Sequence, residues 1–518
     1  MSKDTVHKRK ESFESSDQLS RRYVPSFTPV SLWDKKWELS FTSRFKVPGK
    51  EVGVIRELFK GVLKQLFTQE EIFVYEDRLY HPYWDLIINF LYERGILLEK
   101  GISVKLNPFD GPQLFRFQVT GVSKQGKEGD ERRFIHGAGS SLDSEEAISK
   151  AFGEFLERYF LAQYDKKDII KSSIGALVKK KTPFLHPVTI AESSEEQKKE
   201  FPERQFDKES MFSWVEGYSL TKKRKTLLPA QAAIWRYALG NGEPFLRERN
   251  SNGAGGFFTR EGAILSGLYE LIQRDAFLVW WLSGNAPGKV SLKSITDQAI
   301  QQYIAMIERF NIEVHILETT TDIKVPAYTV ILVDGVKNGV TVGAGAARSP
   351  RKAMLQALNE ALSIHLSVMT KSTFFEDLEM PENLEVFKSP LGLQQRIKFW
   401  GDIKRIPDIE FFLKGEEKSY AACVQNDSSV ISEAEEIGWL CDLLAKHEEH
   451  LEVFVYEKEH PVLEALGFHV AQVIIPGLMF MYLTEKNVPL ASKRVRQAME
   501  GLGGKVRDMW THIPHPFA

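Results

Sequence analysis

The stretch HGAGSSLDSEEAISKAFGEFLERY, residues 136–159, places a Gly-Ala-Gly triplet ahead of a run with helical spacing that carries glutamates. The triplet occurs again at Gly253–Gly255 and at Gly343–Gly345. Behind each triplet an alanine, a small residue and a glutamate follow at one fixed spacing: Ala147, Ala151 and Glu154; Ala263, Gly267 and Glu270; Ala353, Ala357 and Glu360. Such self-similarity predicts an internal repeat in which a glycine loop precedes a glutamate-bearing helix.

The helices of the repeat are expected to begin at equivalent positions. A residue type that favours the N-cap stands four residues before each alanine, at Asp143, Thr259 and Ser349. Its side-chain oxygen can accept a hydrogen bond from a free amide of the first turn. Glu146 has the spacing of a capping box with Asp143, and Pro350 suits the first helical position. For the glycines, the alternative is that they only form tight turns.

The alanine, the small residue and the glutamate of each copy fall at i, i+4 and i+7, so they share one helix face. A stripe of small residues lets another element approach closely, and a carboxylate beside it needs a cation or hydrogen-bond donors. The first copy continues to Glu157 and Arg158, the second to Gln273 and Arg274. Mg2+ prefers carboxylate and phosphate oxygens, and arginine binds phosphate with two parallel hydrogen bonds. The repeat therefore favours a nucleotide-metal site, and the alternative is a pseudo-symmetric core with ordinary ion pairs.

The composition excludes several classes of protein. The 518 residues include 68 basic and 70 acidic side chains, so no net charge favours nucleic acid or an anionic membrane. Only two cysteines, Cys423 and Cys441, occur, which excludes a disulfide framework and a Cys-rich zinc site. The polar N-terminus has no apolar signal-peptide core, and Pro476 interrupts the apolar run Val470–Leu483. A cytoplasmic protein is expected.

An α/β fold is expected, because helical and strand-like periodicities alternate along the chain. Residues 1–25 are expected to be a disordered leader, 26–114 an N-terminal module for partner docking, and 115–518 an ATP-binding domain with a polar insertion around 164–210. The expected helices are Val52–Leu66, Trp84–Leu98, Ile295–Phe310 and Val462–Leu466. The expected strands are Phe115–Val119, Ile312–Leu317, Ala327–Val333, Leu451–Tyr456 and Val470–Ile475.

The segment His447-Glu448-Glu449-His450 suggests a metal pair at first sight, since residues three apart can share a helix face. It lacks the H-E-x-x-H order of zinc proteases, and the sequence indicates no third ligand. We therefore expect an exposed helix there.

At the repeated units the chain resembles the YcaO superfamily, and within it the thiazole/oxazole-forming peptide maturases. The pattern A-x-x-x-A-x-x-E-x-x-E-R matches the stretch from His136, and an S-N-G segment leading to E-L-x-E-R-D-A matches RNSNGAGGFFTREGAILSGLYELIQRDAF from Arg249. VPAYTVILVDG, the NEA that contains Glu360, and VIIPG then follow in family order. The resemblance covers most of Phe115–Ala518 and implies a YcaO-like core.

The resemblance implies ATP and Mg2+ as cofactors, bound by helix glutamates instead of a Walker loop, and no G-x-x-x-x-G-K-[ST] occurs in the sequence. The implied metal ligands are Glu154, Glu157, Glu270 and Glu360. The implied ATP-binding residues are these four together with Arg158, Asn252, Gln273 and Arg274. The C-terminal segment resembles the proline-rich end of peptide-cyclising members, which implies catalytic roles for Pro514, Pro516 and the carboxylate of Ala518.

The implied reaction is ATP-dependent cyclodehydration of Cys, Ser or Thr in a ribosomally made precursor peptide, which gives azolines. One alternative is capture of the activated carbonyl by a sulfur donor, giving a thioamide. Another is a docking scaffold without ATP turnover, because Ala138, Gly262 and Gln273 depart from the family pattern. The implied partners are the precursor peptide, a separate leader-binding protein resembling ubiquitin-activating enzymes, and a flavin dehydrogenase. We expect an oligomer and no nucleic acid or membrane.

Overall fold

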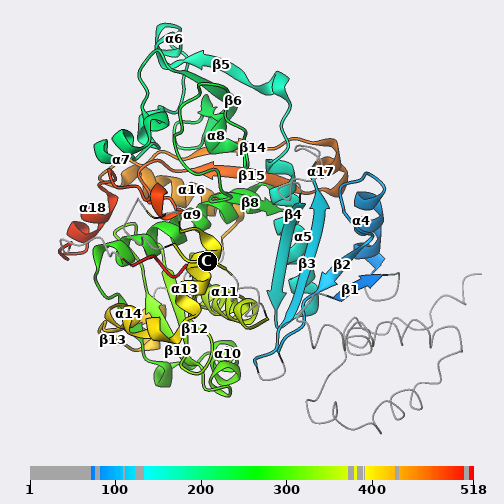
Figure 1. Cartoon of the computed structure of the whole chain (residues 1–518), viewed down its shortest axis with the longest axis vertical. Coiled ribbons are helices and arrows are strands. Elements are labelled where there is room, and N and C mark those ends of the chain that lie inside the picture. The colour runs from blue at the N-terminus through cyan, green and yellow to red at the C-terminus, as the bar shows by residue number, and fades with distance from the viewer. Residues whose placement is uncertain are drawn as a thin grey trace, which may run out of the picture.

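The computed structural model, shown in Figure 1, describes residues 72–75, 82–108, 111–123, 134–370, 378–381, 389, 391–425, 431–506 and 513–517. The expected leader at 1–25, the expected helix Val52–Leu66 and the terminal Ala518 lie outside the described residues. The mixture of helices and sheets confirms the α/β class. None of the described helices is long and apolar enough to cross a membrane.

The described strands form three sheets, in which every pairing is antiparallel except that of β9 with β13. The four-stranded sheet has the order β1-β2-β3-β4, with bounds Ile72–Tyr75, Gly101–Val104, Phe115–Val122 and Phe134–Ser141. The five-stranded sheet has the order β12-β11-β10-β9-β13, with bounds Gly339–Ala346, Ala327–Asp334, Glu313–Glu318, Gly288–Val290 and Glu417–Lys418. The six-stranded sheet has the order β5-β6-β14-β15-β8, with β7 paired to β6. The bounds of these strands are β5 Ile170–Ser173, β6 Met211–Ser219, β14 Phe454–Glu457, β15 His469–Ile474, β8 Ala254–Phe257 and β7 Arg224–Pro229.

Three long helices lie on these sheets. Helix α5, Ser144–Leu161, covers β3 and β4, and α11, Pro350–Thr370, covers β11 and β12. Helix α9, Arg260–Ser283, contacts β8, β15 and β12, so it lies between the two larger sheets at the centre of Figure 1. The shorter helices are α4 Pro82–Tyr92, α6 Ile174–Lys179, α7 Glu195–Glu200, α8 Ala230–Ala233, α10 Gln298–Glu308, α13 Leu393–Gly401, α14 Ile406–Ile409, α15 Tyr420–Val424, α16 Glu433–Lys446, α17 Pro461–Leu466 and α18 Arg494–Gly501.

The expected repeat is present, with one correction to its first half. The triplets Gly137–Gly139 and Gly343–Gly345 lie within strands β4 and β12, and Ala254 and Gly255 lie in β8, because each strand lies directly on the helix that follows it. Gly253 lies in the turn before β8 with a positive φ of 81°, in agreement with the tight-turn alternative. A Cβ atom added to the last glycine of each triplet would lie 2.0–2.2 Å from a helix carbonyl oxygen: Gly139 from Ala147, Gly255 from Ala263 and Gly345 from Ala353. The small residues on each helix face thus form the surface on which its strand packs, as predicted.

The helix starts are also as predicted. Asp143 accepts a hydrogen bond from the Glu146 amide at 2.8 Å, Thr259 from the Gly262 amide at 3.0 Å, and Ser349 from the Lys352 amide at 3.3 Å. The capping box predicted with Glu146 is wrong. Its carboxylate accepts a hydrogen bond from the Ser141 hydroxyl and pairs with Lys150, so it does not return to the Asp143 amide.

Between α5 and β8 the chain forms the upper part of Figure 1, made of β5, β6, β7 and short helices. Much of the polar stretch predicted around 164–210 is exposed on α6, α7 and the loops, but Phe212 and Trp214 on the adjoining strand β6 are buried in a common cluster. Elsewhere the predicted elements agree with the structure within a few residues. The helix expected at Trp84–Leu98 ends earlier, because Gly95 takes a positive φ of 63° and turns the chain.

Candidate nucleotide and metal site

Three glutamates are held at three strand edges. Among the strands that the structure describes, β4, β8 and β12 are each outermost in their sheet, so their outer amides are not used by the sheet ladder. The glutamate of the following helix accepts a hydrogen bond from such an edge: Glu154 from the Ala138 amide at 2.5 Å, Glu270 from the Gly253 amide at 2.9 Å, and Glu360 from the Ala344 amide at 2.7 Å. One carboxylate of each repeat is thus fixed by the backbone of its own unit.

Two arginines lie among these carboxylates. Arg158 places Nη2 2.7 Å from Glu154 Oε1, and its Nη1 donates to the carbonyl oxygen of His136. Arg274 places Nη2 3.4 Å from Glu270 Oε1 and 4.0 Å from Glu360 Oε1. Arg274 therefore joins the second and third repeats through one guanidinium group.

Glu157 lies one turn beyond Glu154 on α5 and faces β8, where a Cβ atom added to Gly256 would lie 3.1 Å from its own Cβ. Burial raises the pKa of Glu157 well above its ordinary value, and the negative charges of Glu270 and Glu154 raise it further against the opposing charge of Arg158. The carboxylates of the first two repeats thus repel one another across the contact between α5 and β8.

Burial also raises the pKa of Glu270 and of Glu360, while Arg274 and a backbone amide act in the opposite direction in both cases. The charges of Glu270 and Glu154 add to the increase at Glu360. The side chains of Glu154, Glu270 and Glu360 nevertheless keep between 26% and 31% of their surface exposed. The carboxylates are crowded together and still reachable from solvent, so a cation that reaches them would relieve their repulsion.

The donors present fit a magnesium-nucleotide complex. The Nε atoms of Arg158 and Arg274 are buried and have no hydrogen-bond partner within the described part of the chain, so neither guanidinium group has all of its donors satisfied. No three His, Cys, Asp or Glu side chains among the described residues are arranged to hold a metal by themselves. Mg2+ commonly takes one or two protein carboxylates and completes its shell with phosphate oxygens and water. The arrangement therefore suits a metal that arrives together with a nucleotide.

Comparison with known proteins agrees with this geometry. Residues 138–479 match the family model described as "YcaO cyclodehydratase, ATP-ad Mg2+-binding". The chain belongs to the YcaO family. The family description names ATP and Mg2+, the cofactors that the sequence resemblance implied.

Solved YcaO structures share this fold. A heterocyclase solved in complex with substrate and cofactor superposes with a TM-score of 0.62 at 19% identity, covering 86% of this chain and 57% of that one. YcaO from Methanopyrus kandleri, bound with AMPPCP and Mg2+, superposes with a TM-score of 0.53 at 17% identity, covering 78% of this chain and 92% of that one.

Two curated relatives are uncharacterized proteins. One, from Methanothermobacter thermautotrophicus, is 27% identical over 157 residues, which are 30% of this chain and 41% of the relative. The other, encoded in the tfuA 3' region of Rhizobium leguminosarum bv. trifolii, is 24% identical over 355 residues, 66% of this chain and 76% of the relative. The chain thus spans less than two thirds of the first curated relative and of the substrate-bound heterocyclase.

The residues that depart from the YcaO pattern have defined places in this structure. Gln273 donates from Nε2 to Glu360 Oε2 at 3.3 Å, so its amide nitrogen is directed at the third repeat. A side chain on Gly262 would meet the ring of Phe257, whose Cδ1 lies 2.2 Å from the position of a Cβ atom.

Asn252, an expected ATP-binding residue, is buried and donates to the carbonyl oxygen of Met481 at 2.9 Å. Its side-chain donor therefore serves the chain segment that follows β15.

The C-terminal segment of this YcaO protein reaches the candidate site. Phe517 is buried, and the centroid of its ring lies 4.2 Å from the guanidinium carbon of Arg274. Trp400 donates from Nε1 to the carbonyl oxygen of Pro514 at 2.9 Å, and Nε2 of buried His515 lies 3.1 Å from the carbonyl oxygen of Tyr482. The segment is anchored and does not have the character of a frayed end. Ala518, one residue beyond Phe517, is outside the described residues.

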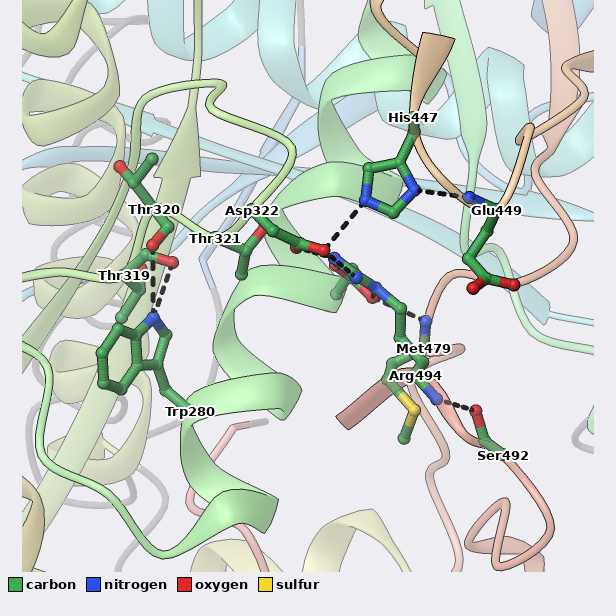
Figure 2. Close-up of polar contacts among 11 residues, drawn as sticks. Trp280, Thr319, Thr320, Thr321, Asp322, His447, Glu449, Met479, Ser492 and Arg494 are labelled. Carbon is green, nitrogen blue, oxygen red and sulfur yellow. Dashed lines mark hydrogen bonds and ion pairs between the residues drawn. The ribbon is translucent and has the colours of Figure 1, made fainter. Parts of the chain in front are cut away.

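Sequence reasoning missed a buried ion-pair cluster directly beside Arg274 (Figure 2). Arg494 on α18 binds Asp275, the residue after Arg274, and Asp322 in the loop between β10 and β11, through contacts of 2.7–3.2 Å. His447 Nε2 lies 2.9 Å from Asp322 Oδ2. The helix expected at His447 is wrong, because α16 ends at Lys446 and the half-buried His447 turns toward Asp322. Glu448, Glu449 and His450 are exposed, as expected. Asp275, which directly follows Arg274 in the sequence, was the feature from which a charged partner could have been expected.

Proposed function

We propose that this chain is an ATP- and Mg2+-dependent cyclodehydratase that acts on backbone amides of a ribosomally made precursor peptide and converts Cys, Ser or Thr to azolines. The observation that carries the proposal is the convergence of glutamates from three repeats around two arginines, Arg158 beside the first repeat and Arg274 between the second and third. Family membership supplies the nucleotide and the metal that fit this group.

In this proposal Glu154, Glu157, Glu270 and Glu360 supply the carboxylate oxygens for Mg2+. Bound ATP with its metal supplies the phosphoryl group that activates the amide oxygen. Arg158 and Arg274 orient the phosphates, and Gln273 and Asn252 complete the nucleotide site. Positioning and charge neutralisation are the main contributions that phosphoryl transfer requires from a protein.

The raised pKa of Glu157 gives the site its dependence on metal. Burial and the neighbouring carboxylates make Glu157 hold its proton to a higher pH than usual, and a bound Mg2+ must displace that proton, so metal binding releases protons. In the free protein the ionised carboxylates repel one another, and a bound Mg2+ would remove this repulsion. We expect the affinity for Mg2+ and ATP to fall as the pH falls through the raised pKa of Glu157.

The C-terminal segment is proposed to contribute Pro514, Pro516 and the carboxylate of Ala518. The contact of Phe517 with Arg274 supports this role. The proposed partners are the precursor peptide, a leader-binding protein resembling ubiquitin-activating enzymes, and a flavin dehydrogenase, and the proposed state is an oligomer.

The test is to incubate the full chain with ATP, Mg2+, a peptide encoded beside its gene and the encoded partner, and then to weigh the peptide. Loss of water at Cys, Ser or Thr supports the proposal, whereas exchange of oxygen for sulfur supports a thioamide-forming enzyme. An unchanged peptide together with no ATP hydrolysis would refute both reactions.

A second candidate, a scaffold that binds nucleotide and peptide without turnover, is favoured by Gly262 and Gln273. Phe257 occupies the space of a side chain at Gly262, and the Gln273 amide adds no negative charge beside Glu360. This candidate predicts that AMPPCP and ATP bind equally with Mg2+ and that ATP stays intact. It also predicts that Gln273→Glu, which restores a carboxylate, produces hydrolysis where the wild type shows none.

A further inference from the structure

A small polar cavity lies between the segments 190–193, 245–248 and 480–489. It holds about 30 Å³ of accessible space, and its walls include Arg204, Arg247, Glu192 and Glu248 together with Phe480 and Tyr482. A water molecule needs roughly 10–15 Å³ measured in this way. The cavity therefore has room for a pair of small polar atoms, such as the oxygens of one anionic group.

Arg247 is nearly without partners. Its Nη2 donates to the carbonyl oxygen of Ala232 at a long 3.4 Å, and its buried Nε has no acceptor within the described structure. Its guanidinium carbon lies 4.1 Å from the ring centroid of Phe480. Burial lowers the pKa of Arg247 to about 10, against the favourable charge of Glu192. A buried guanidinium in such surroundings is costly unless an anion joins it.

Arg204 adds a second cation to the same wall. Its side chain is buried, and its Nη2 donates to the carbonyl oxygen of Lys486 at 3.1 Å and to Asn487 Oδ1 at 2.6 Å. Its buried Nε has no partner among the described residues, and no ion pair with a described carboxylate forms. Two guanidinium groups thus line one cavity.

The negative charge of Glu192 acts on Arg247 and that of Glu248 acts on Arg204, so the net charge of the cavity depends on whether both carboxylates are ionised. Glu248 accepts hydrogen bonds from the Leu483 amide and from Asn487 Nδ2, the latter at 2.7 Å. Burial raises the pKa of Glu192 to about 7, with the charge of Asp275 adding to the increase and Ser492 and Arg247 opposing it. At neutral pH a part of the molecules therefore carries an uncharged Glu192, and the cavity has an excess of positive charge.

We propose that this cavity binds a small oxyanion, a carboxylate or a phosphate group, through Arg247 and Arg204. The planar fork of arginine matches the paired oxygens of both groups. The cavity is separate from the candidate nucleotide site, since Arg158, Arg274 and the four glutamates are not among its walls. It adjoins that site through Tyr482, whose carbonyl oxygen contacts His515. This inference does not depend on the proposed cyclodehydratase activity.

The cavity gives the binding a defined pH dependence. Glu192 faces Arg247, Asp275 and Ser492, and Arg204 and Glu248 complete the charged wall. As the pH rises through about 7, Glu192 ionises and places a negative charge beside the proposed anion. The affinity for an oxyanion is therefore expected to fall over this interval.

The test is calorimetric titration of the full chain with inorganic phosphate and, separately, with acetate, in the presence of saturating AMPPCP and Mg2+ to occupy the nucleotide site. Arg247→Lys keeps the charge and removes the fork, so we expect affinity to fall roughly ten- to hundredfold. Glu192→Gln, on the opposite wall, should keep the affinity and abolish its decline above neutral pH.

Binding of phosphate alone would identify free or esterified phosphate as the natural group, and equal binding of acetate would identify a carboxylate-bearing ligand. Both outcomes support the cavity as an oxyanion site. Absence of binding by either probe overturns the proposal, as does binding that Arg247→Lys leaves unchanged. Because Glu192→Gln is expected to retain the binding that Arg247→Lys weakens, a general loss of folding cannot imitate the pattern.

Discussion

Replacing Arg494 by lysine tests whether the buried cluster beside Arg274 holds α9 in place. The guanidinium contacts Asp275 and Asp322 at 2.7–3.2 Å through all of its nitrogens. Lysine has three donors against five, so at least two charge-assisted hydrogen bonds are lost, each worth about 1.5–3 kcal/mol. Lysine keeps the positive charge, so the loss of two such bonds sets the magnitude, and we expect Arg494→Lys to lower the free energy of unfolding by about 3–6 kcal/mol.

Urea unfolding followed by circular dichroism measures this loss. Arg496→Lys is the matched control, because Arg496 lies on the same helix with an exposed side chain, and we expect it to stay within about 0.5 kcal/mol of the wild type. Equal unfolding midpoints for the two variants would refute the energetic role assigned to the cluster.

The same cluster predicts an acid dependence. Burial alone would raise the pKa of Asp322, but hydrogen bonds and charges from Arg494 and His447 hold it below the ordinary value of 3.8. The stabilisation by Asp322 is therefore fully present above pH 3.8 and is lost as the pH falls through the lower pKa of the folded state. A wild-type acid-unfolding curve that matches that of Arg494→Lys would contradict this assignment.

Three further predictions concern the repeats and the C-terminal segment. Because the folded state raises the pKa of Glu157, ionising this residue at neutral pH destabilises the fold. Glu157→Gln should therefore raise the melting temperature of the free protein and weaken the binding of ATP with Mg2+ measured by calorimetry. A lowered melting temperature would contradict the repulsion between the carboxylates. Gly139→Ala should destabilise the fold by about 1–3 kcal/mol in urea unfolding, because its Cβ atom would lie 2.0 Å from the Ala147 carbonyl oxygen. The control is Gly153→Ala, which has open space around its Cβ position and should stabilise α5 by about 1 kcal/mol in the same assay. Phe517→Leu removes the aromatic face beside Arg274 but keeps apolar volume. A cation–π energy of roughly 0.5–1 kcal/mol corresponds to an ATP affinity about two- to fivefold lower. An unchanged affinity would show that the C-terminal segment does not contribute to the nucleotide site.

The local part of the site was predictable from sequence. The spacing of Ala147, Ala151 and Glu154 fixes a helix face without knowledge of any distant contact, and the same holds for the caps at Asp143 and Thr259. The three helices, their starts and the small-residue contact surfaces were therefore obtained correctly.

Contacts between distant segments were not predictable in the same way. His447 was misassigned because its partner, Asp322, lies 125 residues away and only the fold brings them together. The glycine triplets were assigned to loops because glycine favours turns, and their close contact with helix carbonyls becomes visible only once strand and helix are placed together. The edge positions of β4, β8 and β12 depend on strand order, which a single sequence does not reveal.

The hydrogen bonds from strand edges to Glu154, Glu270 and Glu360 have a consequence for how this molecule is assembled. The edge of each sheet anchors one carboxylate of the helix that follows it, so the three carboxylates come from three different sheets. A ligand that binds all three stabilises only the fully docked arrangement, in proportion to its concentration over its dissociation constant. Nucleotide binding then favours the arrangement in which all three sheets are docked together. Slower hydrogen exchange of the amides of Ala138, Gly253 and Ala344 in the presence of nucleotide would report this docking at each sheet separately.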